Sequence, residues 1–70
     1  MTEQKIGELA GHVWRFLESH GGQADYNTIR RQIGTHDGIP VEMGVGWLAR
    51  EGKISFQHDG DTVRMALRRN

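Results

Sequence analysis

The stretch from Pro40 to Ile54 constrains the fold more than any other part of the chain. Three apolar residues recur there at helical spacing and predict the buried stripe of one helix: Val41, Val45 and Leu48. Pro40 suits the first turn of that helix, where its missing N–H is not needed. Gly52 suits the end, because glycine adopts a left-handed conformation without a Cβ clash. Residues 53–56 then alternate polar and apolar, so we expect a strand directly after the helix.

A helix that leads straight into a β-hairpin is how a winged helix-turn-helix domain joins its recognition helix to its wing. Two blocks of sequence add a resemblance: GWLAREGKI at residues 46–54 and IGELAGHVW at residues 6–14. On these blocks and their spacing, nearly the whole chain resembles a family of small, stand-alone prokaryotic winged helix-turn-helix proteins of uncharacterised function. The resemblance implies an α+β fold with three helices followed by a β-hairpin wing, and it implies a biochemical role only by analogy.

The first helix is predicted over residues 3–19. Its apolar residues share one face, at helical spacing: Ile6, Leu9, Ala10, Val13, Phe16 and Leu17. Gly7 and Gly11 lie beside that face, near Trp14. Each glycine costs a helix about 1 kcal/mol relative to alanine, so we expect another element to approach the backbone there. That element is either part of the same domain or a helix of a second subunit.

The middle of the chain is predicted to hold a second helix between two turns. Gln23 and Ala24 suit a short third strand of the wing sheet. Asp25 can cap the second helix, whose apolar residues are Tyr26, Ile29 and Ile33. Residues 34–38 are expected to form a turn, longer than the family pattern suggests, and Asp37 is the better cap for the third helix.

The remaining residues are predicted to form the wing. Ile54 and Phe56 should face the core from the first wing strand. Asp59-Gly60 is a strong signal for a two-residue hairpin turn in which both residues have positive φ. The second wing strand should turn three apolar residues inward: Val63, Met65 and Leu67. Residues 68–70 form a basic tail that we expect to be frayed.

Length and composition narrow the class of protein. The chain has 70 residues, and we interpret residues 1–70 as one winged-helix domain. So short a chain buries only about 60% of its unfolded surface, which makes a homodimer a natural source of further burial. Nine basic residues balance nine acidic ones, whereas dedicated nucleic-acid binders usually have a basic excess. With neither a signal-peptide core nor a membrane-length apolar run, the expected location is the cytoplasm.

The sequence does not suggest an enzyme. Its hydroxyl side chains have no evident base and orienting partner, and there is no cysteine. The four histidines, at positions 12, 20, 36 and 58, follow no recognised metal-binding spacing. We therefore expect no catalytic residue, metal, cofactor or small-molecule substrate, and we interpret the histidines as solvated surface residues.

The outer face of the third helix decides whether the domain could read DNA. Glu42, Met43 and Gly46 are poorly suited to contacts in a DNA groove. Only Arg50 could contact guanine in a bidentate manner. The wing tip around Asp59 and Asp61 is acidic. Basic residues elsewhere could still contact phosphates, and the candidate nucleic-acid contacts are Arg30, Arg31, Arg50, Lys53, Arg64, Arg68 and Arg69.

Two functions therefore remain open. The first is a homodimeric nucleic-acid-binding protein that acts as a small transcription regulator on double-stranded DNA. The alternative is a dimerisation or protein-interaction module that does not read DNA, because aromatic and methionine side chains are enriched at protein interfaces. The candidate residues for a dimer or partner interface are Gly7, Gly11, Trp14, Met43 and Trp47.

Overall fold

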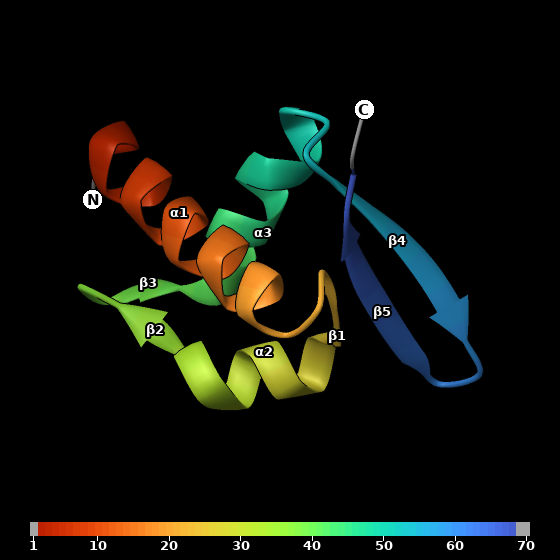
Figure 1. The fold of residues 1–70 in the computed structure, drawn as a ribbon. Helices are drawn as coiled ribbons and strands as arrows, with labels where there is room; N and C mark the ends of the chain where they lie inside the picture. The colour runs from red at the N-terminus through yellow and green to blue at the C-terminus, as the bar shows by residue number, and fades with distance from the viewer. Residues whose placement is uncertain (1, 69–70) are drawn as a thin grey trace.

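The computed structural model describes residues 2–68, and its elements follow the order of a winged helix-turn-helix domain (Figure 1). The elements are α1 (Glu3–Ser19), β1 (Gln23–Asp25), α2 (Tyr26–Ile33), β2 (Thr35–His36), β3 (Ile39–Pro40), α3 (Val41–Arg50), β4 (Ile54–Asp59) and β5 (Thr62–Leu67). The predicted α+β class, the three helices and the hairpin wing are confirmed. The predicted tail residues 69 and 70 lie outside the described residues.

Helix α1 is the longest element and packs against α3 (Figure 1). The Thr2 hydroxyl caps its first turn by accepting from the Lys5 N–H at 3.2 Å. Four residues of the predicted stripe are buried, namely Leu9, Ala10, Val13 and Leu17, and the other two are half-buried. Since Leu17 and Val13 are fully covered, α1 supplies the centre of the core.

The wing is part of a three-stranded antiparallel sheet in the order β1-β5-β4. The expected short strand at Gln23 is therefore confirmed. Met65 in the central strand is buried, and its register partners are Ala24 in β1 and Phe56 in β4. Phe56 is 46% exposed although it shares a face with Met65. Because β4 is the edge strand and runs out beyond the helices, the prediction that Phe56 is core is wrong (Figure 1).

A small hairpin, β2–β3, replaces the turn expected between α2 and α3 (Figure 1). Its two-residue loop is Asp37-Gly38, with φ of 52° and 77°, which is the pattern of a type I′ turn. The Val41 N–H donates to the Gly34 carbonyl at 2.9 Å and closes the hairpin. Asp37 therefore does not cap α3. The N-cap is Pro40, which makes no side-chain capping bond.

Two further local predictions need correction. Asp25 stands at the N-cap of α2 but makes no side-chain capping bond, and its buried Oδ1 has no hydrogen-bond partner within residues 2–68. In the wing, Asp59 pairs with Thr62, so the two loop residues are Gly60 and Asp61. Only Gly60 has positive φ, at 65°, as the first central residue of a type II′ turn does. The hairpin is thus shifted by one residue from its predicted position.

Candidate nucleic-acid interface

Helix α3 buries the predicted stripe and leaves the opposite side in solvent. Val41, Val45 and Leu48 are buried, as their spacing indicated. The exposed residues include Glu42 in the first turn, Met43 at 37% exposure, Gly46 and Arg50. Gly52 follows the helix with φ of 71°, the left-handed conformation expected for it. The face that would meet a DNA groove therefore carries few groups that can read a base edge.

Trp47 is half-buried and lies over Gly7 of α1. A Cβ at Gly7 would stand 3.6 Å from Cζ2 of this indole, which is ordinary van der Waals contact. The element that approaches Gly7 is thus α3 of the same chain. At Gly11 the nearest group is the Arg15 guanidinium, 3.5 Å from the position that a Cβ would take, and Arg15 belongs to the same helix.

A shallow hollow of about 270 Å³ opens between α1 and the end of α3. Its lining combines two indoles, two cations, three small residues and one leucine: Gly7, Ala10, Gly11, Trp14, Arg15, Trp47, Leu48 and Lys53. Four of the five residues expected at a dimer interface line this hollow: Gly7, Gly11, Trp14 and Trp47. Met43 is not among the lining residues.

The first turns of α2 and α3 are joined by a hydrogen bond in which the Tyr26 hydroxyl donates to the Glu42 carboxylate. This bond raises the pKa of the Tyr26 hydroxyl, with smaller contributions from desolvation and from the Glu42 charge. The same bond lowers the pKa of the Glu42 carboxyl, and the nearby Arg30 adds to that effect. A carboxylate is thereby held at the start of α3, where it would oppose phosphate.

Three of the predicted cations gather where α3 ends and the wing begins. Arg50 is the last residue of α3, and Lys53 stands just before β4. The Arg68 N–H donates to the Lys53 carbonyl at 2.9 Å, which brings the end of the wing back to its start. All three side chains are exposed. We call Arg50, Lys53 and Arg68 the wing-base cluster.

The other predicted cations lie elsewhere. Arg30 and Arg31 are exposed on α2, and Arg64 is exposed on β5, opposite Gln57 and Asp25 in register. Arg69 lies outside the described residues. Within residues 2–68 the one ion pair joins Lys5 to Asp37, so none of the six described candidates is held by a carboxylate of that range.

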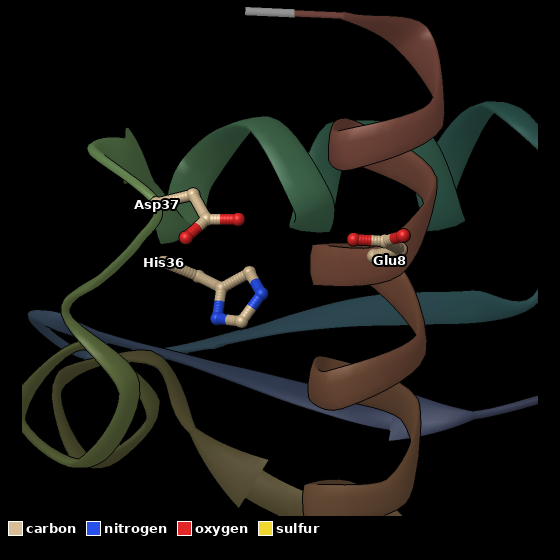
Figure 2. A group of neighbouring side chains, drawn as sticks. All are labelled: Glu8, His36 and Asp37. Carbon is tan, nitrogen blue, oxygen red and sulfur yellow. The ribbon is translucent and has the colours of Figure 1, made fainter.

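Sequence reasoning missed one cluster of polar side chains. The β2–β3 hairpin carries His36 and Asp37 to the side of α1, beside Glu8 (Figure 2). The ring of His36 also lies 4.4 Å from that of His12, measured between centroids. The histidines at positions 12 and 36 are thus neighbours in space although the chain separates them. No local spacing could have shown this, because the hairpin that brings the residues together was itself not predicted.

Comparisons with known proteins agree with this architecture. The sequence profile of a family described as "Winged helix-turn-helix domain (DUF2582)" matches residues 1–67. An uncharacterized protein of the archaeon Methanocaldococcus jannaschii is 45% identical over an alignment of 58 positions, and the match covers 79% of each chain. Comparison with solved structures gives no match. No helix of the described residues is long and apolar enough to cross a membrane.

Proposed function

Because the chain belongs to this family of winged helix-turn-helix domains, we propose that it binds double-stranded DNA as a homodimer and acts as a small transcription regulator. The observation that carries the proposal is the wing-base cluster. Its three exposed cations stand at the junction of the recognition helix and the wing, and none of them forms an ion pair with a carboxylate of residues 2–68. Since prokaryotic DNA lies in the cytoplasm, the proposal includes a cytoplasmic location.

The binding mode that fits these residues is contact with phosphates. Base readout in helix-turn-helix proteins comes mainly from the N-terminal part of the recognition helix. Here that part presents Glu42, Met43 and Gly46, and the Glu42 charge is retained by Tyr26. Arg30, Arg31 and Arg64 would add phosphate contacts, as would Arg69. Because phosphate contacts carry no sequence information, we expect similar affinity for unrelated duplexes.

The homodimer rests on the small size of the chain and on the hollow between α1 and α3. A second copy that covered the hollow would bury Trp14 and Gly11 together with the exposed side of Trp47. Met43, at 37% exposure, would add apolar area if the interface continued along α3. Two linked copies would also double the number of phosphate contacts per complex, which raises affinity without a new kind of contact.

A second candidate function is a protein-interaction module. The observation that favours it is the start of α3, where Glu42 is engaged by Tyr26 and Met43 is exposed. A partner segment with an apolar and a basic residue would suit this pair, whereas a phosphate would not.

Fluorescence anisotropy with labelled duplexes of unrelated sequence distinguishes the two functions. The DNA proposal predicts a Kd of about 1–100 µM at physiological salt, the usual range for non-specific binding. Replacing Lys53 and Arg68 by glutamine should weaken binding to every duplex alike. Lys5→Gln is the matched control, because Lys5 lies in the first turn of α1, on the far side from the wing (Figure 1). No binding even at low salt would leave the interaction module as the function.

A further inference from the structure

We propose that Glu8, His36 and Asp37 form a binding site for one divalent transition-metal ion, of which Zn²⁺ is the natural probe. One potential ligand atom from each residue lies within 4.8 Å of the other two. Figure 2 shows the Glu8 carboxylate facing the hairpin and the Asp37 carboxylate and His36 ring facing α1. The site is therefore shared between a helix and a hairpin that are distant in sequence.

The donor set suits a borderline metal ion. Imidazole favours zinc, nickel, copper and iron over magnesium and calcium, while carboxylates accept most divalent ions. Tetrahedral zinc with bonds of about 2.0–2.1 Å separates neighbouring ligand atoms by about 3.3 Å. The ligand atoms, which lie within 4.8 Å of one another, therefore have to approach by at most roughly 1.5 Å. Glu8 and Asp37 are exposed, so rotation of their side chains can supply this movement. Three protein ligands would leave a fourth position for water.

The surroundings of the three side chains favour a cation. Two carboxylates that face each other repel, and no hydrogen bond within residues 2–68 uses the side chain of Glu8, His36 or Asp37. The cation now nearest is Lys5, whose Nζ is 3.8 Å from Asp37 Oδ2 with both side chains about half exposed. An ion bound in the middle would satisfy both carboxylates and would displace this weak pair.

His12 lies beside the imidazole of His36. Its ring centroid is 4.4 Å from that of His36, with the planes tilted by 51°. Its Nδ1 is 3.4 Å from an Arg15 guanidinium nitrogen, which can only donate. His12 is not one of the residues whose ligand atoms all lie within 4.8 Å of one another, so it is not counted among the ligands.

The test is calorimetric titration of the chelator-treated full chain with zinc chloride. We expect one equivalent to bind, with Glu8→Gln and Asp37→Asn each weakening affinity at least tenfold. Asparagine tolerates the positive φ of 52° at position 37, so the turn is preserved. Glu18→Gln on the same helix and His58→Ala in the wing are matched controls and should bind as the wild type does. Lys5→Gln should strengthen binding, because it removes the competing cation.

NMR of the imidazole groups locates the ion independently of folding effects in the variants. The His36 resonances should change until one equivalent of zinc is added, while those of His58 remain unchanged, and an excess of magnesium should not reverse the change. No binding up to millimolar zinc would overturn the proposal. It would also be overturned if both carboxylate variants kept wild-type affinity, if the controls were weakened as much, or if magnesium displaced the zinc. None of these results depends on whether the domain binds DNA.

Discussion

Gly44 of α3 lies directly against Leu9 of α1, so that a Cβ on the glycine would stand 2.8 Å from Leu9 Cγ. The backbone nitrogen of Ala10 would be only 3.1 Å away. No side chain fits in this space without moving helix backbone. The absence of a side chain at Gly44 therefore sets how closely the recognition helix approaches α1.

This contact predicts opposite effects for two glycines of one helix. Gly44→Ala should lower the free energy of unfolding by about 1–3 kcal/mol, as overpacking of a core does. At Gly46 no atom lies within 4 Å of the position that a Cβ would take, so Gly46→Ala should raise it by about 0.5–1 kcal/mol through helix propensity. Urea denaturation measures both. Equal changes of the same sign would show that α1 and α3 do not pack this closely.

The bond between Tyr26 and Glu42 predicts a pH-dependent contribution to stability. Glu42 has a lowered pKa in the folded state, so its contribution is fully present above its ordinary value of 4.5. That contribution disappears as the pH falls through the lowered pKa. For Tyr26 the folded-state pKa is raised, so its contribution is present below 10.0 and disappears as the pH rises through the raised value.

Thermal melting of the wild type and Tyr26→Phe over a pH series tests the predicted direction of this pH dependence. The wild type should melt at a higher temperature near neutral pH, and the difference should vanish in acid. Glu42→Gln is the control, because glutamine does not titrate. The difference in melting temperature between Glu42→Gln and the double variant Glu42→Gln/Tyr26→Phe should be the same at neutral and at acidic pH. A difference between wild type and Tyr26→Phe that grew in acid would contradict the hydrogen bond as described.

The homodimer is tested by sedimentation at tens of micromolar, where we expect twice the chain mass. Gly11→Gln should produce monomers, because its side chain would enter the hollow while displacing only the end of Arg15. Glu18→Gln, also on α1 but outside the hollow, should leave the mass unchanged. A wild-type protein of single-chain mass would remove the dimer from the proposal.

The parts of the fold that the sequence predicted are those with a local signal. The bounds of α1 follow from the regular apolar stripe from Ile6 to Leu17, and the end of α3 follows from Gly52. The stripe of α3 also contained Gly44, which stands three residues after Val41 and one before Val45. A glycine at a core position of that stripe indicates close packing of the helix. The sequence prediction places the close approach at Gly7 and Gly11 instead, and of these two only Gly7 is approached by another element.

The β2–β3 hairpin could not be predicted from periodicity, because strands of two residues have none. Its Asp37-Gly38 loop carries the same Asp-Gly signal as the wing, where the turn instead forms one residue later, at Gly60-Asp61. The Asp-Gly signal is therefore correct at Asp37, the residue that the sequence predicts as a helix cap. The cluster of Glu8 with His36 depends on this hairpin, so it became visible only with the tertiary structure.

The central claim is that the wing-base cluster binds phosphates. The most direct measurement is the slope of log affinity against log salt for a random duplex, compared between the wild type and a variant with Arg50, Lys53 and Arg68 changed to glutamine. We predict micromolar, salt-sensitive binding for the wild type, and a slope that is smaller by about 0.9 for each phosphate that the variant no longer neutralises. An unchanged slope, or a wild type that does not bind duplex DNA at low salt, would contradict the claim.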